Sequence, residues 1–337
     1  MTRLYIVTGA AGHLGNTIVR DLCDTGERVR CFIMPNDTAP ALTGLNVEIV
    51  YGDICKASEL APLFNETDKF ETIVLHTAGI VSIATKFDQN MYDVNVLGTL
   101  NLIEHCQKHQ VKRLIYISSV HAIPEQPERQ IIRETTDFDP EAVVGFYAKT
   151  KAEATRYVLA SATAGLDCVV IHPSGIGGPN DYGHGHFKQL VMDFLDGRLT
   201  AFINGGYDFV DVRDVSKGII AAVDKGRTGE CYILSNRFVS VSELLHLLAE
   251  LSGKKRLKTI LPLWFVRLTV PLAELWYQFK KQKPLYTRYS LYTLGSNSNF
   301  SHQKADTELG YTTRSLRETL LDTIVFLQQT NSLKRPK

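Results

Sequence analysis

The chain has 337 residues, of which 44% are hydrophobic and 22% charged, an ordinary composition for a globular protein. That length suits two domains, or one large domain with a smaller one embedded in it. The formal net charge is +1 and neither half of the chain carries a long basic block, so charge does not suggest nucleic-acid binding.

The six cysteines fall mostly in apolar segments and show no C-x-x-C spacing, which predicts free thiols in a reducing compartment. The N-terminal residues MTRLYIVTGA lead directly into a strand pattern and lack the features of a signal peptide. No uninterrupted apolar run reaches the ~18 residues that a membrane span requires. The nearest candidate, Ile260–Phe279, contains Arg267, Glu274 and two prolines. We therefore expect a cytoplasmic protein without an integral membrane segment.

Short apolar runs alternate with helix-length amphipathic segments along the first half of the chain. In chain order the runs are RLYIVT, RVRCFIM, NVEIVYGD, ETIVLHTAG, KRLIYISS and DCVVIHP. Nearly continuous Val, Ile and Leu strands that alternate with helices predict an α/β fold, a doubly wound parallel sheet covered on both faces.

After Pro173 this alternation stops at a glycine-rich segment, SGIGGPNDYGHGHF. A strand-like run, ECYILSN, returns at Glu230, and helical patterns dominate the rest of the chain. We predict a first domain made of residues 1–173 and 208–235. Residues 174–207 and 236–337 are expected to form a smaller, mostly helical C-terminal domain that binds the substrate.

Three glycines, Gly9, Gly12 and Gly15, separate the first strand from the first helix in the sequence VTGAAGHLG. Glycine permits a sharp turn and a close approach of the backbone to a pyrophosphate, and the helix N-terminus then supplies N–H groups and a positive dipole end. A glycine-rich turn between a strand and a helix at the start of a parallel sheet therefore predicts a dinucleotide-binding domain with a Rossmann fold.

A second pattern, YAKTK, places Tyr147 and Lys151 one helical turn apart, on the same face of a helix. Free tyrosine has a pKa of about 10, too high for an efficient base at neutral pH. A lysine ammonium at this spacing is expected to stabilise the phenolate and to lower the pKa of Tyr147.

Taken together, the glycine loop and the Y-x-x-x-K pattern resemble the short-chain dehydrogenase/reductase superfamily in its extended branch, the NAD-dependent epimerase/dehydratase family. Further similar segments follow in order: GDI, HTAG, NVLGTLNLIEHC, YISSV, HPSGIGGPND and GGYDFVDVRDVSKGI. The resemblance spans nearly the whole chain and is closest to dihydroflavonol reductase-like and hydroxysteroid dehydrogenase-like proteins.

The resemblance implies a catalytic set of Ser119, Tyr147 and Lys151. Ser118 is a second candidate, but neighbouring strand residues point to opposite faces, and comparison with the family pattern favours Ser119. The implied cofactor-binding residues are Gly9, Ala11, Gly12, His13, Leu14, Gly15, Met34, Asp53, Ile54, Thr77, Ala78, Gly79, Asn95, Ser118, Tyr147, Lys151, His172, Pro173, Gly175 and Ile176.

The choice between NAD and NADP remains open, with NADP slightly favoured. A carboxylate after the second strand would select NAD and a basic residue would select NADP, but that position is Met34. Asp37 is interpreted as a turn residue, and Arg30 lies inside the strand.

Three segments have two or more interpretations. His184 and His186 lack a third ligand at suitable spacing, so they are interpreted as part of a glycine-rich lid, and no metal is expected. His121 is expected near the pocket, as a substrate contact or as loop packing. Ile260–Phe279 is interpreted as pocket wall or domain core, or as a membrane patch, which its few polar residues of mixed sign disfavour.

We expect an NAD(P)-dependent oxidoreductase that interconverts an alcohol and a ketone or aldehyde on a fairly apolar small molecule. The first alternative is a nucleotide-sugar epimerase with retained NAD, and the second is a non-catalytic cofactor-binding sensor. A dehydratase is disfavoured because no acidic pair accompanies the serine. The partners expected are a small-molecule substrate and, as an option, a second copy of the chain in a homodimer; no nucleic acid is expected.

Overall fold

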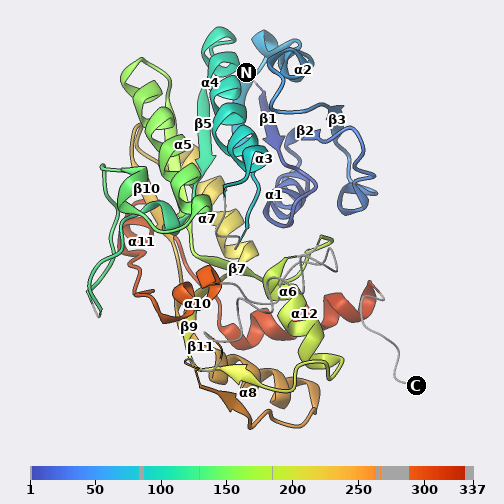
Figure 1. Ribbon diagram of the computed structural model, residues 1–337. Coiled ribbons are helices and arrows are strands. Elements are labelled where there is room, and N and C mark those ends of the chain that lie inside the picture. The colour runs from blue at the N-terminus through green and yellow to red at the C-terminus, as the bar shows by residue number, and fades with distance from the viewer. Residues whose placement is uncertain are drawn as a thin grey trace.

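The computed structural model describes residues 2–82, 87–128, 130–183, 185–262, 264, 266 and 288–330. In this part of the chain a seven-stranded parallel sheet has the order β3-β2-β1-β4-β5-β6-β10 (Figure 1). Its strands are β1 (Arg3–Thr8), β2 (Arg28–Ile33), β3 (Glu48–Tyr51), β4 (Glu71–His76), β5 (Arg113–Ile117), β6 (Cys168–Pro173) and β10 (Cys231–Leu234). The predicted doubly wound parallel sheet is therefore confirmed.

Except for the edge strand β3, whose residues are mostly exposed, the strands are buried on both faces because helices cover each face. In β1, Leu4 and Ile6 belong to one core cluster and Tyr5 and Val7 to another, as the alternation of side chains along a strand requires. The first cluster lies beneath α4 (Gly98–Lys108) and α5 (Phe146–Thr163). The second lies beneath α1 (His13–Asp24), α7 (Val212–Lys225) and α11 (Gln303–Leu309).

The strand order reverses between β1 and β4, so the connections that leave these two strands run in opposite directions along the sheet. In open α/β sheets this point leaves a crevice at the carboxyl ends of the strands, where ligands bind. Most of the cofactor and catalytic residues expected from the sequence lie at or after the carboxyl ends of β1 to β6 or on α5, and Asn95 lies in the helical turn Asp93–Leu97.

A third core lies away from the main sheet. It is formed by α6 (His186–Leu195), α8 (Val241–Ser252) and α12 (Leu316–Gln329), which Figure 1 shows in the lower part of the molecule. A sheet of β7 (Gly175–Gly177), β9 (Gly206–Asp211) and β11 (Arg237–Ser240) connects this core with the main sheet. Helix α11 falls in the range predicted for the smaller domain but packs beneath the main sheet, so the exact domain ranges remain a prediction.

Short elements complete the description. They are α2 (Ala57–Leu60), α3 (Gln89–Tyr92), α10 (Arg288–Gly295), the paired strands β8 (Phe202–Ile203) and β12 (Ile260–Leu261), a π-helical turn (Asp93–Leu97) and the 3-10 turns Pro40–Leu42, Ala61–Phe64, Thr67–Lys69, Val120–Ala122 and Pro140–Ala142.

Most of the apolar segment Ile260–Phe279 lies outside the described residues. Within it, Ile260 and Leu261 form β12, the Trp264 side chain is exposed, and Val266 is buried against Leu291 of α10. In the described part of the chain, no helix combines the length and the apolar character that crossing a bilayer requires.

Candidate active site

The glycine loop turns tightly between β1 and α1. Gly9 has φ +66°, and a Cβ on it would lie 2.7 Å from backbone atoms of Ala78. A Cβ on Gly15 would lie 2.2 Å from the Gly9 carbonyl oxygen. Packing within the chain therefore requires glycine at both positions. Gly12 differs: it is exposed with an ordinary φ of −69°, and a Cβ there would approach only the Gly9 carbonyl, at 3.2 Å.

The N-terminus of α1 has the properties of an anion site. No side chain caps it and its first turn contains no acidic residue, so its N–H groups and positive dipole end are not compensated locally. His13 Nε2 lies 2.8 Å from the Pro179 carbonyl and ties the loop to the segment after β7. The glycine cradle and this helix end fit the pyrophosphate of a dinucleotide, and Ala11, Gly12, His13 and Leu14 are the residues predicted to surround it.

The residues after β2 provide neither the carboxylate that would select NAD nor the basic side chain that would select NADP at the adenosine ribose. Met34 has 54% of its surface exposed directly after the strand. Asp37 accepts a hydrogen bond from the Ala39 N–H at 2.7 Å, which fits its interpretation as a turn residue. Arg30 is buried, where it donates to the Leu63 carbonyl at 2.8 Å and pairs with Glu48 at 2.9 Å. The Arg30 guanidinium is therefore engaged by these contacts inside the protein.

Asp53 and Ile54 follow β3 at the same edge of the sheet. The Asp53 carboxylate accepts the Cys55 N–H at 3.0 Å, while the backbone N–H of Asp53 donates to Glu59 at 2.7 Å. Asp53 is half-buried and Ile54 fully buried. The family resemblance implies that Asp53 holds the adenine amino group of the cofactor, and this contact stays a prediction.

The turn after β4 brings small residues beside Lys151. Thr77 Oγ1 donates to the Thr8 carbonyl at 2.6 Å. A Cβ on Gly79 would lie 3.2 Å from Asn95 Oδ1 and 3.4 Å from Lys151 Nζ, so glycine keeps this space open.

Asn95 occupies the π-helical turn Asp93–Leu97, a rare conformation that is frequent at functional sites. Its side chain accepts from the Ile80 N–H at 2.8 Å and donates to Thr150 Oγ1 at 3.1 Å. Asn95 therefore joins the β4 turn to α5, the helix that carries Tyr147 and Lys151.

The two serines after β5 have different surroundings. Ser118 Oγ lies 2.7 Å from Thr155 Oγ1, within the packing between β5 and α5. Ser119 Oγ accepts the His121 N–H at 3.2 Å and also interacts with the Tyr147 hydroxyl. Strand alternation thus directs Ser119, and not Ser118, toward Tyr147.

Tyr147 and Lys151 are both buried on α5. Lys151 Nζ donates to the Ile117 carbonyl at 2.8 Å and lies 5.0 Å from the centroid of the Tyr116 ring. Burial lowers the pKa of Lys151 to about 7. Burial also raises the pKa of Tyr147 to about 12, although the hydrogen bond with Ser119 lowers it. For Tyr147 this direction is opposite to the one expected from the Tyr–Lys spacing, because desolvation by burial is the largest influence on its pKa.

The residues at the end of β6 lie behind the serine. His172 is buried, and its Nδ1 donates to the Ser119 carbonyl at 2.9 Å. Its ring stacks on Phe138 with 5.2 Å between centroids. Pro173 ends β6, and Gly175 and Ile176 form β7, which pairs with β9. His172 therefore supports the backbone that carries Ser119.

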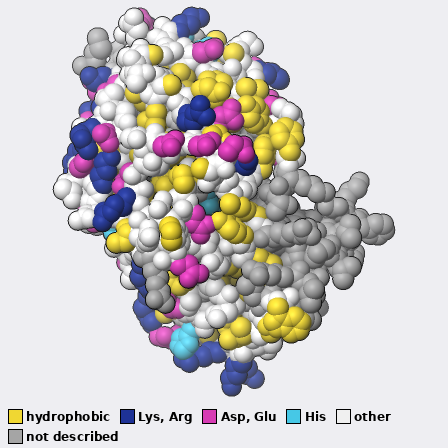
Figure 2. Space-filling model, turned by 60° about the vertical axis from the view of Figure 1, so that its left-hand side comes forward, with side chains coloured by type: hydrophobic (Ala, Val, Ile, Leu, Met, Phe, Trp, Pro, Cys, Tyr) yellow, Lys and Arg dark blue, Asp and Glu magenta, His cyan; other side chains and the backbone are white. Residues whose placement is uncertain are grey.

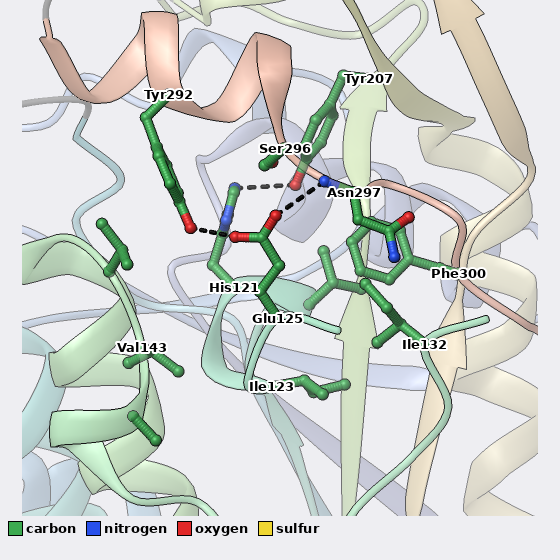
Figure 3. A pocket seen from close by; sticks show the side chains of 13 residues that line it. His121, Ile123, Glu125, Ile132, Val143, Tyr207, Tyr292, Ser296, Asn297 and Phe300 are labelled. Atoms are coloured by element: carbon green, nitrogen blue, oxygen red, sulfur yellow. Dashed lines mark hydrogen bonds between the residues drawn. The ribbon is translucent and has the colours of Figure 1, made fainter. Parts of the chain in front are cut away.

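A cavity of about 50 Å³, with room for a part of a substrate rather than a whole ring compound, lies next to this set (Figure 3). The described lining is largely aliphatic and aromatic, with one carboxylate and no Lys or Arg: Val120, His121, Ile123, Glu125, Ile132, Ala142, Val143, Val144, Tyr207, Tyr292, Ser296, Asn297 and Phe300. Figure 3 shows Glu125 between Tyr292 and Asn297, and hydrogen bonds join its carboxylate to the Tyr292 hydroxyl and to the Asn297 N–H.

Sequence reasoning missed Tyr207, Tyr292 and Glu125 at this pocket. They come from β9, from α10 and from the loop after β5, segments that are brought together only by the tertiary structure. His121 was expected near the pocket and lines it.

No metal cluster is present among the described residues: none of them form a group of three or more His, Cys, Asp or Glu that could hold a metal ion. His184, one of the paired histidines of the glycine-rich segment, lies outside the described residues. On the face displayed in Figure 2, basic and acidic side chains are interspersed, without a large patch of one sign.

The fold and the site define a dinucleotide-dependent enzyme class with a serine, a tyrosine and a lysine at the centre. Residues 5–235 match the model of the NAD dependent epimerase/dehydratase family, and the chain belongs to this family.

Named relatives extend the match to almost the full length. The chain is 32% identical over 330 residues to sterol demethylase protein B of Methylococcus capsulatus, covering 96% of this chain and 98% of the relative. It is 29% identical to a protein of Synechocystis named putative dihydroflavonol 4-reductase, covering 99% and 97%. The solved structure of gox2253 superimposes with a TM-score of 0.85 at 28% identity, covering 98% and 99%. The chain is thus an enzyme, an NAD(P)-dependent dehydrogenase/reductase of the extended short-chain type.

Proposed function

We propose that this enzyme interconverts an alcohol and a ketone or aldehyde on a fairly apolar small molecule. The observation that carries the proposal is the buried set of Ser119, Tyr147 and Lys151 beside a pocket whose described lining contains no Lys or Arg. Such a lining favours uncharged, apolar ligands, since burying a charge without a partner is costly.

In the reductive direction a hydride is added to the carbonyl carbon and a proton to the carbonyl oxygen. A bound nicotinamide dinucleotide supplies this hydride. Tyr147 donates its hydroxyl proton to the oxygen, and the Ser119 hydroxyl, oriented by the His121 N–H, stabilises the developing negative charge. Lys151, one helical turn from Tyr147 on α5, stabilises the resulting phenolate.

The Tyr147 pKa of about 12 suits this direction, because a buried tyrosine keeps its proton until the oxygen becomes basic. Lys151, with a pKa of about 7, gains or loses a proton near neutral pH. We therefore propose that Lys151 couples the proton of Tyr147 to solvent.

The nucleotide-sugar epimerase with retained NAD is the alternative, in keeping with the family description. A nucleotide sugar carries a diphosphate, which proteins usually hold with Arg, Lys or helix N-termini. The cation-free described lining supports the oxidoreductase over the epimerase. The second alternative, a non-catalytic sensor, does not account for a serine, a tyrosine and a lysine held together at the sheet edge.

Names of two relatives support an apolar substrate. Sterol demethylase protein B is named for a sterol and the Synechocystis reductase for a dihydroflavonol, both of which contain fused rings and no ionised group. We propose a substrate of comparable character, a ring ketone or the corresponding alcohol.

For the cofactor we propose NADP or NAD, with NADP slightly favoured because Met34 supplies no carboxylate to repel a 2′-phosphate. Met34→Asp is expected to shift the preference toward NAD and Met34→Arg toward NADP, each by about tenfold or more. Fluorescence titration of each variant with NADH and NADPH measures the shift. Equal changes for both cofactors would mean that Met34 does not lie at the ribose.

Two further expectations remain proposals, a cytoplasmic location and a homodimer. The exposed apolar side chains Leu97 and Tyr157 are compatible with a dimer contact on the helical face of the main sheet. Light scattering of the purified protein gives the oligomeric state.

A homologous series of ketones tests the proposed substrate class. We expect affinity to rise with chain length until the pocket is filled, by up to about 0.8 kcal/mol for each buried methylene. Nucleotide sugars serve as the comparison. Conversion of a nucleotide sugar without net consumption of added cofactor would support the epimerase instead.

A further inference from the structure

His121 and Tyr207 form a polar pair in the wall of the largely apolar pocket (Figure 3). His121 lies in the 3-10 turn Val120–Ala122, two residues after Ser119, and Tyr207 lies on β9. His121 Nε2 is 2.8 Å from the Tyr207 hydroxyl, and the two rings stack with 5.5 Å between centroids and 18° between planes. The pair is held by two elements that are far apart in sequence.

This pair adjoins the catalytic centre. The His121 ring meets the Tyr147 ring edge-on, at 6.2 Å between centroids and 74°. The backbone N–H of His121 donates to Ser119 Oγ at 3.2 Å. A substrate whose reacting oxygen contacts Tyr147 and Ser119 thus has its next few atoms beside the imidazole.

The hydrogen bond within the pair leaves one polar hydrogen free. If Tyr207 donates to Nε2, the imidazole proton sits on Nδ1 and points away from the bond. If Nε2 donates instead, the Tyr207 hydroxyl keeps its own hydrogen. In the described part of the chain, the His121 side chain forms only the hydrogen bond to Tyr207. Either arrangement offers a donor to a ligand in the pocket, where an unmade hydrogen bond is costly.

We propose that His121 and Tyr207 bind a second, uncharged oxygen of the substrate, a hydroxyl or carbonyl near the reacting carbon. This inference rests on the proposed function and makes it more specific. At ~1.5 Å for each covalent bond, the spacing between the imidazole and Tyr147 corresponds to an oxygen about two to four bonds from the reacting carbon. The substrate class is then an apolar ring ketone with a neighbouring hydroxyl or carbonyl group.

The surroundings of the pair favour an uncharged group over a carboxylate. The only charged side chain among the described lining residues is the Glu125 carboxylate, which repels anions. Burial lowers the pKa of His121 to about 4, so the imidazole is neutral at pH ~7 and brings no positive charge. The pair therefore acts on a ligand as an uncharged hydrogen-bond donor, through the imidazole or through the Tyr207 hydroxyl.

Three ring ketones of one scaffold test the proposal: 4-chromanone, 3-hydroxy-4-chromanone and 4-chromanone-2-carboxylate. For the natural chain we expect kcat/KM to be about tenfold higher with the hydroxyl compound than with 4-chromanone, the value of one hydrogen bond to a buried donor. The carboxylate compound should be the poorest of the three.

Two variants keep the rings and remove the polar atoms: His121→Phe and Tyr207→Phe. We expect the ratio of kcat/KM between the hydroxyl compound and 4-chromanone to fall to about one in His121→Phe, mainly through KM. Tyr207→Phe should lower it partly, and the double variant should fall no further than His121→Phe, since the two residues act as a unit. Thermal unfolding checks that each variant is folded.

If both variants keep the natural chain's ratio of kcat/KM between the hydroxyl compound and 4-chromanone, the proposal is overturned, because the pair would then only pack in the pocket wall. Highest activity with the carboxylate compound would overturn the preference for an uncharged group. If no ketone is reduced with either cofactor, the proposed function fails. Calorimetric titration of the enzyme–NADP⁺ complex with the three compounds then tests separately whether the His121–Tyr207 pair binds the second oxygen. Equal affinity for 4-chromanone and its hydroxyl derivative would then contradict it.

Discussion

The three glycines of the β1–α1 loop are present for different physical reasons. Gly9 and Gly15 are required by contacts within the chain, at 2.7 Å and 2.2 Å from a hypothetical Cβ. Gly12 is exposed with an ordinary φ, so the chain itself requires glycine there less strictly. The backbone approach of a pyrophosphate explains Gly12 best.

Gly12→Val should therefore weaken cofactor binding and leave the fold intact. We expect the Kd for NADPH to rise by tenfold or more, that is by about 1.4 kcal/mol or more, while Tm changes little. Gly295→Val is the matched control, because Gly295 has no heavy atom within 4 Å of a Cβ. Unchanged cofactor affinity in Gly12→Val would show that the loop is only a turn.

Lys151 is a residue whose function costs stability. Its pKa of about 7 in the folded chain is below the ordinary value of 10.5, because burial disfavours the ammonium. Between these two values the unfolded chain binds more protons, so this residue makes stability rise with pH; below about pH 7 the full penalty is present.

Lys151→Met should therefore stabilise the chain most at low pH. We expect the gain in Tm over the natural chain to be larger at about pH 6 than at about pH 9. Thermal unfolding followed by circular dichroism at both pH values measures this difference. A gain that does not depend on pH would mean that Lys151 is not desolvated in the folded chain.

At the scale of the elements, the strands and the catalytic helix could be predicted because each carries its own signal. Buried parallel strands read as continuous apolar runs, and the Tyr147–Lys151 spacing marks one helix face. The π-helical turn at Asn95 has no such signal, since it depends on hydrogen bonds to Ile80 and Thr150.

The pocket wall was predictable only in part, for a related reason. Tyr207 contacts His121, and Tyr292 contacts Glu125, although each pair comes from segments far apart in the chain. No local sequence pattern predicts such contacts.

The register at the end of β5 gives a test at this scale. Ser119→Ala should lower kcat strongly, because it removes the hydroxyl beside Tyr147. Ser118→Ala should act mildly and mainly on stability, by about 1 kcal/mol, because its hydroxyl bonds to Thr155 within the packing between β5 and α5. Steady-state kinetics and denaturant unfolding of both variants separate the two effects. The reverse order would place Ser118 in the site.

In the molecule as a whole, a buried carboxylate joins the main sheet to the third core. Asp211, at the end of β9, caps α7 by accepting the Arg213 N–H and pairs with Arg213 at 2.8 Å and Arg314 at 3.0 Å. Arg213 continues the network to Asp322 of α12 at 2.6 Å. Burial would raise the pKa of Asp211, but hydrogen bonds from Arg213 hold it below its ordinary value.

Asp211→Asn should destabilise the chain by about 3–5 kcal/mol, because it leaves two partly buried arginines without their shared partner. A lowered pKa means that Asp211 contributes stability above the carboxyl's unfolded value of about 4, and that this contribution is lost as pH falls below it. The loss of stability of the natural chain below about pH 4 should therefore be smaller in the variant. Denaturant unfolding of both proteins across this pH range measures the difference. An equal loss of stability in acid for both would show that ionised Asp211 does not contribute to stability.

The central claim is that Tyr147 protonates a carbonyl oxygen while a hydride is added to the carbon. It is tested most directly by a single turnover of 3-hydroxy-4-chromanone with a limiting amount of NADPH that carries deuterium on the transferred position of C4. Mass spectrometry should find one deuterium on the carbinol carbon of the product, with one cofactor oxidised for each alcohol formed. Tyr147→Phe should bind the cofactor and form no deuterated alcohol. Retention of activity in Tyr147→Phe within about tenfold of the natural chain, ~1.4 kcal/mol of barrier, would contradict the account.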